Sequence, residues 1–551
     1  MRKKTRFKKS LCAAIILNIV LGYAASAQNV IWEFDTDTGH EKPAWVEKLT
    51  IINDFSGDLV PEVVAGSVHY GCKVFCIEGA TGDLLWDYAM TPDYAPVGDL
   101  KTVQDLNGNG SQEVLVAQGY IASIPPTPPT GPKLFCLEGV SGEEIWSFTP
   151  DPQGYIPVIS LMPDVTGDGV SDIIAGSCSN WVALVDGSNG NQLWSASVNG
   201  MYVQSVSPIE DVNNDGVSDV LIGNWVSGNK SDETRDLHYQ DAVSGVYCFS
   251  GADGTMIWER TIGDIQMNCV KNIADIDNDG KQDVITGTMD GAMYCLSGEN
   301  GNTIWMTPTS EFIQEIVVNQ DINGDDKNEI IAGTWDDNVY CFDGATGDIL
   351  WAYKVVNWVH TVAIAEDVSG DGINDILVGD RGLGVGGDIY LGSVYCLDGF
   401  SGNLMWKYET DHMVWAVTQT GDANGNGALD VIAGSDDGYV YCLEGNQDVG
   451  IGNEKALNSI GSLFQNKPNP FISETEIRFV VTYPGQITNI TIYDVNGVKI
   501  KTLFDEKVSI GEYSVIWNGT DDSGNSVPEG VYFYHYQNNT IIETKQMILM
   551  K

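Results

Sequence analysis

The sequence predicts an all-β protein, an eight-bladed β-propeller closed by an N-terminal strand and followed by a small immunoglobulin-like β-sandwich. Three observations predict this fold. An aspartate-rich loop occurs eight times, at spacings of 51, 59, 47, 64, 46, 46 and 55 residues. Short β-rich runs separated by Gly, Asn and Asp follow each loop, and seven of the repeats end in a tryptophan. Repetition at this period is typical of repeat architectures, and four short strands per repeat indicate propeller blades.

Residues 1–27 are predicted to be a Sec signal peptide. They contain six basic residues at the start, an apolar run from Leu11 to Leu21 and a final Ala25-Ser26-Ala27, which is the order of charged, apolar and small residues in such peptides. We therefore expect export through the periplasm to a secreted or outer-surface location. No later stretch approaches the roughly 20 apolar residues of a membrane-spanning helix, so the mature chain is expected to have no transmembrane segment.

The mature chain is strongly acidic. Without the signal peptide it has 22 Lys and Arg against 76 Asp and Glu, a net charge of −54. Such a surface repels nucleic acid and anionic membranes, so nucleic acid is not an expected partner. The same charge favours the binding of divalent cations.

The repeated loop has the pattern of a calcium site. In the fifth copy, Asp275 to Asp283, oxygen-bearing side chains stand at positions 1, 3, 5 and 9 and a glycine stands at position 6. Ca²⁺ prefers six to eight oxygen ligands, and a tight turn with this spacing supplies most of them. The predicted calcium ligands of the eight loops are Asp54, Ser56, Asp58 and Glu62; Asp105, Asn107, Asn109 and Glu113; Asp164, Thr166, Asp168 and Asp172; Asp211, Asn213, Asp215 and Asp219; Asp275, Asp277, Asp279 and Asp283; Asp321, Asn323, Asp325 and Glu329; Asp367, Ser369, Asp371 and Asp375; and Asp422, Asn424, Asn426 and Asp430.

The alternative interpretation of these loops is ordinary β-turns, in which Asn, Asp and Gly are also common. Turn formation does not require acids at both the first and the ninth positions, yet all eight loops have both. We therefore favour bound calcium. Because fewer carboxylates weaken calcium affinity, the second and eighth loops, with two acids each, should empty first on chelation.

The seventh repeat illustrates the predicted strands. Residues 358–365, 375–379, 393–398 and 404–408 form four β-rich runs, with the aspartate loop between the first two. The last repeat lacks a fourth strand, and the N-terminal run 30–34 carries the tryptophan that such a strand would supply. Pairing of the two ends would close the ring and remove exposed sheet edges.

Seven cysteines occupy one repeat position in the third predicted strand. They are Cys76, Cys136, Cys248, Cys295, Cys341, Cys396 and Cys442. Equivalent positions of neighbouring blades should lie beyond the roughly 7 Å Cα separation that a disulfide allows. We expect these side chains to be small buried apolar groups.

Two motifs resemble known propeller repeats. The segment from Cys341 to Trp351, Cys-Phe-Asp-Gly-Ala-Thr-Gly-Asp-Ile-Leu-Trp, resembles the tryptophan-docking repeat of quinoprotein (PQQ-type) eight-bladed propellers. The aspartate loop resembles the FG-GAP loop of integrin-type propellers, which binds calcium. Together they define a predicted propeller domain over residues 28–446. The adjacent cysteine pair typical of quinoprotein alcohol dehydrogenases is absent, so PQQ is not an expected cofactor and no catalytic residue is assigned.

A ligand is expected on the rim opposite the aspartate loops. The insertions 120–132, 224–244 and 380–392 fall in second-to-third-strand connections on that rim, where variable loops held by a scaffold often bind ligands. Positions nine and seven residues before each loop place aromatic and polar side chains at the channel mouth. The expected ligand-binding residues are Trp45, Tyr155, Tyr202, Phe312, Trp358, His360 and Trp415. The alternative is that the aromatic rings wedge between blades.

The acid–base groups predicted near this mouth form no compact constellation. Glu47, Asp99, Glu315 and His360 belong to four different repeats, whereas general acid–base catalysis requires its groups within reach of one substrate. We therefore expect a non-catalytic binding or adhesion module for a glycan or protein ligand. The alternatives are an extracellular polysaccharide lyase-type enzyme and a PQQ-dependent dehydrogenase.

The C-terminal part has a different pattern. Residues 447–462 lose the repeat and are predicted to be a linker, and residues 463–551 are predicted to be a second β domain. Five of its segments, in order, resemble the type A C-terminal sorting domain of the type IX secretion system: 464–471, 490–497, 511–519, 530–534 and 545–551. This resemblance implies a Gram-negative member of the Bacteroidetes and the type IX secretion machinery as a partner. The alternative is an accessory β domain that binds something else.

Overall fold

The computed structural model describes residues 29–36, 44–69, 71–91, 95–119, 131, 133–151, 154–199, 202–225, 244–262, 267–386, 389–445, 463, 466–481, 487–494, 498–507, 511–538 and 541–550. Within these ranges the elements are β-strands, which confirms the all-β prediction. The chain divides into two compact units, Met1–Asp448 and Val449–Lys551. The predicted signal peptide and linker lie outside the described residues. The described residues contain no helix long and apolar enough to cross a membrane.

The described strands of the first unit form eight four-stranded antiparallel sheets. In chain order of their first strands, the sheets are β2 (Trp45–Ile52), β3 (Glu62–Val68), β4 (Lys73–Ile77) and β5 (Leu84–Ala89); β6 (Val97–Val103), β7 (Glu113–Gln118), β8 (Leu134–Leu137) and β9 (Glu144–Phe148); β10 (Val158–Met162), β11 (Asp172–Gly176), β12 (Trp181–Val185) and β13 (Gln192–Ser197); β14 (Tyr202–Ile209), β15 (Asp219–Trp225), β16 (Gly245–Phe249) and β17 (Met256–Thr261); β18 (Met267–Ile273), β19 (Asp283–Thr288), β20 (Ala292–Leu296) and β21 (Thr303–Pro308); β22 (Ile313–Val318), β23 (Ile330–Thr334), β24 (Asn338–Phe342) and β25 (Ile349–Lys354); β26 (Val359–Ala365), β27 (Asp375–Gly386), β28 (Ile389–Leu397) and β29 (Leu404–Glu409); and β30 (Val414–Gln419), β31 (Val431–Ser435), β32 (Tyr439–Leu443) and β1 (Val30–Asp35).

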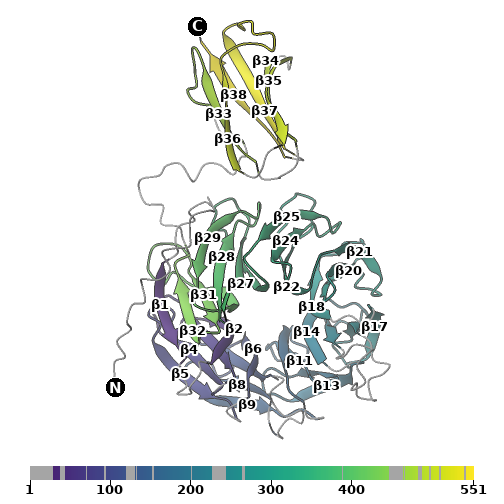
Figure 1. The fold of residues 1–551 in the computed structure, drawn as a ribbon. Coiled ribbons are helices and arrows are strands. Elements are labelled where there is room, and N and C mark those ends of the chain that lie inside the picture. The colour runs from purple at the N-terminus through teal and green to yellow at the C-terminus, as the bar shows by residue number, and fades with distance from the viewer. Residues whose placement is uncertain are drawn as a thin grey trace. The chain divides into compact units, whose positions relative to one another are not determined.

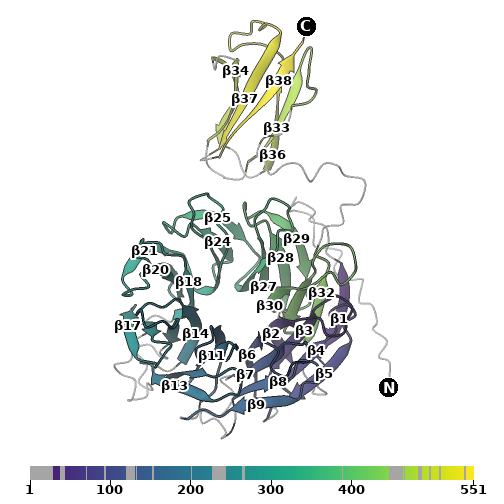
Figure 2. The same cartoon turned by 180° about the vertical axis from the view of Figure 1, so that it is seen from behind.

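These sheets stand around a common centre. Figures 1 and 2 show first strands such as β6, β14 and β18 towards the centre and fourth strands such as β9, β13 and β17 at the periphery. The first strand of each sheet packs beside the first strands of its neighbours, and β2 packs beside β30. Four-stranded sheets arranged radially in this way define a β-propeller fold.

A tryptophan of each sheet forms a hydrogen bond to the next sheet. Its indole Nε1 donates a hydrogen bond to a glycine carbonyl of the following sheet, with N···O distances from 2.7 to 3.3 Å. The pairs are Trp32–Gly79, Trp86–Gly139, Trp146–Gly187, Trp194–Gly251, Trp258–Gly298, Trp305–Gly344, Trp351–Gly399 and Trp406–Gly445. A second glycine makes room for the ring: at Gly347, with φ of 77°, an added Cβ would lie 2.5 Å from the Trp305 ring. The repeated tryptophan and glycines are therefore explained by contacts between sheets.

The N-terminal strand belongs to the eighth sheet. Strand β1 pairs antiparallel with β32, with Trp32 opposite Cys442 and Asp35 opposite Tyr439. The predicted run 30–34 thus supplies the fourth strand that the last repeat lacks.

Apolar side chains fill the spaces between adjacent sheets. One cluster joins Val64 and Val74 of the first sheet to Leu100 and Val116 of the second, and comparable clusters lie between later sheets. The seven repeat cysteines are 0 % exposed and form no disulfide, which confirms their predicted role as small buried groups.

The insertion 380–392 was expected to be a connection, and the structure corrects this in part. Strands β27 and β28 extend beyond the predicted 375–379 and 393–398, and they pair as far as Gly386 and Ile389. Asp380 stabilises the extension because its carboxylate accepts the Ser393 N–H and the Tyr395 hydroxyl, each at 2.8 Å.

The second unit contains two β-sheets. Strands β33 (Thr475–Val481) and β36 (Gly511–Trp517) form one, and β35 (Lys499–Lys507), β34 (Ile487–Asp494), β37 (Gly530–Asn538) and β38 (Ile541–Leu549), in that order, form the other. Its core includes the fully buried Phe479, Trp517 and Tyr534. Apolar residues alternate along the strands, as in an immunoglobulin-like domain.

Candidate functional site

Each aspartate loop connects the first strand of a sheet to the second, and its first residue organises the turn. In the fifth loop the Asp275 carboxylate accepts the backbone N–H groups of Asp279 and Gly280, at 3.1 and 2.9 Å. The first residues of the other loops accept loop N–H groups similarly: Asp54, Asp105, Asp164, Asp211, Asp321, Asp367 and Asp422. For Asp54, Asp105, Asp164 and Asp321 these bonds hold the pKa below its usual value.

The ninth residue of every loop is an acid that is 0 % exposed. These acids are Glu62, Glu113, Asp172, Asp219, Asp283, Glu329, Asp375 and Asp430. Asp283 Oδ2 accepts the N–H groups of Ile276 and Asp277, at 2.6 and 3.2 Å. Burial raises the pKa of all eight, to about 7 for Glu329 and to about 6 for Asp283, Asp375 and Asp430. A nearby cation would offset this cost because opposite charge favours the ionised form.

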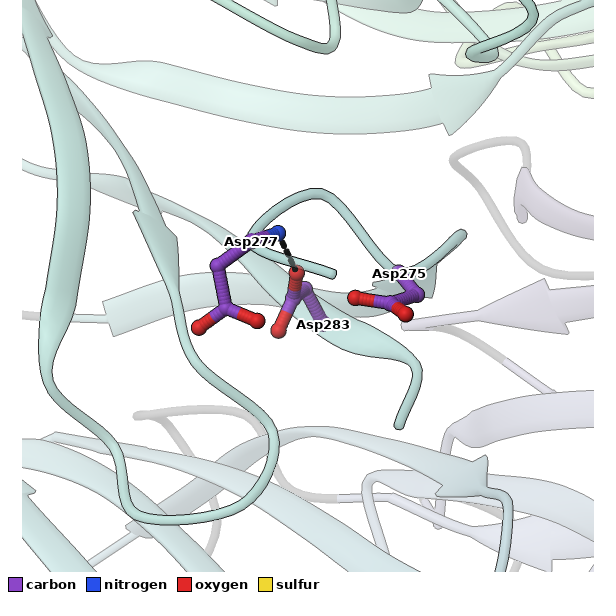
Figure 3. Close-up of side chains that lie close together, drawn as sticks. All are labelled: Asp275, Asp277 and Asp283. Carbon is purple, nitrogen blue, oxygen red and sulfur yellow. Dashed lines mark hydrogen bonds between the residues drawn. The ribbon is translucent and has the colours of Figure 1, made fainter. Parts of the chain in front are cut away.

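The fifth loop brings three carboxylates together. One oxygen each from Asp275, Asp277 and Asp283 lies within 4.8 Å of the others, and Figure 3 shows the three side chains around the turn, with the Asp277 N–H bonded to Asp283. In the described part of the chain, no other three His, Cys, Asp or Glu residues meet this geometry. Hard oxygen ligands at this spacing suit a calcium-sized cation.

Two loops contain a buried oxygen that lacks a hydrogen-bond partner. These atoms are Oε2 of Glu62 in the first loop and Oε1 of Glu329 in the sixth. The negative charges of Asp54 and Asp58 act on Glu62, and those of Asp321 and Asp325 act on Glu329. An unpaired buried carboxylate oxygen beside two further acids is costly, so the donor set fits a bound cation in these loops.

The polar residues predicted at the channel mouth are β-bulge residues. In seven of the eight sheets, the residue seven positions before the loop is the extra residue of a bulge in the first strand: Glu47, Gly98, Gln204, Asn268, Gln314, His360 and Trp415. A bulge leaves this residue without a cross-strand partner and redirects its side chain, and bulges often stand beside functional sites.

Aromatic rings connect the sixth sheet to the seventh. Phe312 contacts Trp335 with centroids 4.7 Å apart, and Trp335 stacks on Trp358 at 4.4 Å with an interplanar angle of 3°. The guanidinium of Arg381 lies 4.3 Å from the Trp358 ring, and Trp335 Nε1 donates to Gln314 at 3.1 Å. Trp358 is therefore already packed against an aromatic ring and a cation.

The aromatic contacts continue across the seventh, eighth and first sheets. The rings of His360 and Trp415 lie 4.2 Å apart, those of Trp415 and Trp45 lie 6.3 Å apart and stacked, and those of Trp45 and His69 lie 4.0 Å apart. We call the set Phe312, Trp335, Trp358, His360, Trp415, Trp45 and His69 the aromatic arc. It covers four consecutive sheets.

The remaining expected ligand residues lie outside this arc. Tyr155 is 2 % exposed and Phe312, at one end of the arc, is 6 % exposed, so little of either ring is accessible to a ligand. Tyr202 stacks on Trp225 at 4.8 Å in the fourth sheet. The structure thus gathers Trp45, Phe312, Trp358, His360 and Trp415 and leaves Tyr155 and Tyr202 apart.

Burial shifts the protonation of the ionisable groups around the arc. It raises the pKa of Glu47 to about 7, an effect that Lys48 opposes and Asp436 increases. It lowers the pKa of His360 to about 4, and the charge of Arg381 adds to this shift. Both ring nitrogens of His360 and Nε1 of Trp415 are buried without a hydrogen-bond partner. At neutral pH His360 is therefore uncharged, and Glu47 is about half protonated.

Two of the predicted acid–base groups have structural partners. Asp99 Oδ2 accepts the Ile159 N–H and Glu315 Oε2 accepts the Val362 N–H, both at 3.0 Å, and each bond joins neighbouring first strands. These two carboxylates hold adjacent sheets together.

The sequence prediction missed a set of residues that lie within the second strands or directly after them. Trp225, Trp335, Arg381 and Asp436 all stand six residues after the ninth acid of their loop, and His69 stands seven after. The same repeat counting, continued forwards from the ninth acid, would have found them.

Two family profiles match parts of the chain. The FlgD Ig-like domain profile matches residues 469–539, and the Lambda-carrageenase beta-propeller domain profile matches residues 298–363. No curated protein is significantly similar in sequence.

Solved propeller structures are similar in fold. Saccharomyces cerevisiae Sqt1 is 11% identical over 77% of this chain and 100% of its own, with a TM-score of 0.56. The C-terminal WD40 domain of Sif2 is 12% identical over 77% of this chain and 99% of its own, with a TM-score of 0.50. The computationally designed Ika8 protein is 15% identical over 73% and 97%, with a TM-score of 0.50. The chain is thus a β-propeller protein with an Ig-like domain.

Proposed function

We propose that this protein is a secreted or cell-surface, calcium-stabilised eight-bladed β-propeller that binds a glycan or protein ligand without catalysis. The aromatic arc carries the binding proposal. It concentrates seven aromatic or imidazole rings on four neighbouring sheets, beside bulge residues that depart from the regular strand pattern. Aromatic faces with a few polar groups are the usual lining of ligand sites.

Several contacts support a closed ring of eight blades. The first unit has eight four-stranded sheets, β1 pairs with β32, and Trp32 donates to Gly79 of the first sheet. The tryptophan–glycine contacts support the PQQ-like repeat, and the loop geometry supports the FG-GAP repeat.

Calcium is the proposed cation of the aspartate loops. The carboxylate cluster of Asp275, Asp277 and Asp283 and the unpaired oxygens of Glu62 and Glu329 support this assignment. The ion would supply positive charge to eight buried acids and fix each turn between the first and second strands.

A glycan is the favoured ligand class. The partial match to a propeller domain named for lambda-carrageenase supports a polysaccharide ligand. The same match is to a domain named for an enzyme, so the second candidate is an extracellular enzyme that acts on a polysaccharide, and a polysaccharide lyase is the form that the next measurements test.

Three measurements on the purified protein separate the candidates. Retention on a glycan array with no growth of unsaturated-uronate absorbance on pectic substrates is the result expected of a binding module. Growth of that absorbance would instead indicate a lyase. Quinone absorbance that survives dialysis would instead indicate a PQQ-dependent dehydrogenase.

The C-terminal domain is proposed to direct export through the type IX secretion system of a member of the Bacteroidetes. The Ig-like architecture of the second unit and its motif order support this role. Deletion of residues 463–551 should leave the protein in the periplasm, as cell fractionation would detect. Unchanged surface display after the deletion would instead support an accessory domain.

Glu47 should make stability depend on pH. Its pKa is raised by burial from 4.5 to about 7, so the folded state holds a proton that the unfolded state releases. Stability from this group is fully present below about pH 4.5 and is lost as the pH rises to about 7. Glu47→Gln should therefore raise the free energy of unfolding at pH 8, by up to about 3 kcal/mol, and leave it unchanged at pH 4.5.

Urea unfolding of both proteins at the two pH values, with saturating calcium throughout, measures this difference. The exposed Glu143, in the turn between β8 and β9 of the second sheet, provides the matched control, because Glu143→Gln removes the same charge outside the arc. Equal effects of the two substitutions would contradict the assignment to Glu47.

A further inference from the structure

One glycine residue links each of six buried loop acids to a tryptophan of the preceding sheet. In the fifth sheet, Asp283 Oδ1 accepts the Gly298 N–H at 2.9 Å, and the carbonyl of Gly298 accepts the Trp258 Nε1–H at 2.7 Å. The same chain of two bonds occurs in Trp86–Gly139–Glu113, Trp146–Gly187–Asp172, Trp194–Gly251–Asp219, Trp351–Gly399–Asp375 and Trp406–Gly445–Asp430.

This glycine is held in a tight space. A Cβ added to Gly298 would lie 1.8 Å from the carbonyl oxygen of Gln282, so the glycine packs directly on the backbone that precedes Asp283. Its N–H bonds to the loop acid and its carbonyl accepts the indole N–H. The link is therefore geometric, because the two bonds fix the position of the glycine from both sides.

We propose that these six tryptophans are positioning residues for the cation sites of the next sheet. This inference rests on the proposed calcium loops. Gly298 fixes one oxygen of Asp283 while the N–H groups of Ile276 and Asp277 fix the other. The indole of Trp258 positions Gly298, Gly298 orients the Asp283 carboxylate, and this carboxylate would hold the cation together with Asp275 and Asp277.

The first and sixth sheets provide an internal control. Trp32 and Trp305 donate to Gly79 and Gly344 at 2.8 and 3.0 Å. The loop acids of these sheets, Glu62 and Glu329, each have one buried oxygen without a partner. In these two sheets the tryptophan therefore donates to the glycine carbonyl, but the glycine N–H does not bond to the unpaired oxygen of the loop acid.

Because coupling between two sites is reciprocal, cation binding in the fifth loop should also change the Trp258 hydrogen bond. The test uses the full mature chain with ¹⁵N-labelled tryptophan, and Trp258→Phe and Trp305→Phe assign the two indole signals. Asp277→Asn weakens the fifth loop and Asn323→Ala weakens the sixth. Both positions are exposed and outside the glycine link.

The Trp258 indole signal should shift between calcium and chelator, and Asp277→Asn should abolish this shift. The Trp305 signal should not depend on Asn323→Ala. By calorimetry, Trp258→Phe should weaken the tightest calcium site about 5-fold, whereas Trp305→Phe should leave the sixth-loop affinity unchanged.

Three results would overturn the proposal, and they are distinguishable. If the Trp258 indole shift is the same in calcium and in chelator, while calorimetry shows that Asp277→Asn removes a site, the glycine link is excluded. The proposed calcium loops are then retained. A Trp305 response to Asn323→Ala equal to the Trp258 response to Asp277→Asn would exclude the specific glycine path. No calcium binding by the wild-type chain would exclude both this inference and the proposed cation.

Discussion

Chelation of calcium is expected to lower the melting temperature of the propeller by more than about 10 °C. At a free concentration 100 times its dissociation constant, a ligand adds about 2.7 kcal/mol of stability at each site. Occupancy of several of the eight loops would therefore contribute on the order of 10 kcal/mol, a large part of the stability of a typical domain. The physical reason is that fully buried loop acids would lose the compensating charge of the proposed cation.

Calorimetric melting in excess calcium and in excess chelator measures this effect. Asp277→Asn should reduce the calcium-dependent part, because Asp277 belongs to the three-carboxylate cluster. Asp253→Asn is the matched control, since Asp253 is an exposed turn residue outside the loops. A melting temperature that is equal in calcium and chelator would show that the loops are turns stabilised by their own hydrogen bonds.

The repeat positions made most of the propeller predictable from sequence. Trp305 and Gly344 recur because one donates to the other across a sheet boundary, and Cys341 recurs at a fully buried position within an apolar cluster. The acid at the ninth loop position recurs because its carboxylate accepts the backbone N–H groups that hold the loop in shape. A physical requirement repeated eight times leaves a sequence signal that a single occurrence would not.

The aromatic arc was only partly predictable because its rings come from several repeat positions and from only four of the eight sheets. Trp358 and Trp415 were found by counting back from the loops, but Trp335 and His69 come from the ends of second strands. Whether an aromatic ring at a repeat position packs between sheets or remains accessible depends on its neighbours. Tyr155 is buried and Trp45 is half-buried, although counting gives the two residues the same position.

Replacement of Trp45 and Trp415 by alanine is expected to abolish glycan retention without unfolding the propeller. Both rings are half-buried, and their stacked contact lies at the centre of the arc. Removal of a central aromatic contact at a binding site typically costs about 2 kcal/mol or more, which is about a thirtyfold loss of affinity. Retention on immobilised glycan and affinity by calorimetry measure the loss, and the melting temperature in calcium measures the fold.

Tyr202→Ala is the control that shows whether a loss of binding is specific to the arc. Tyr202 stands at the start of a first strand and also stacks on a tryptophan, Trp225. It belongs to the fourth sheet and lies outside the arc. If the ligand binds the arc, Tyr202→Ala will retain binding while the Trp45 and Trp415 double variant loses it. Equal losses would indicate a ligand that contacts the whole mouth, and undiminished binding by the double variant would exclude the arc. Because the tryptophans that tie the sheets together are a separate set of residues, the double variant tests recognition without removing those contacts.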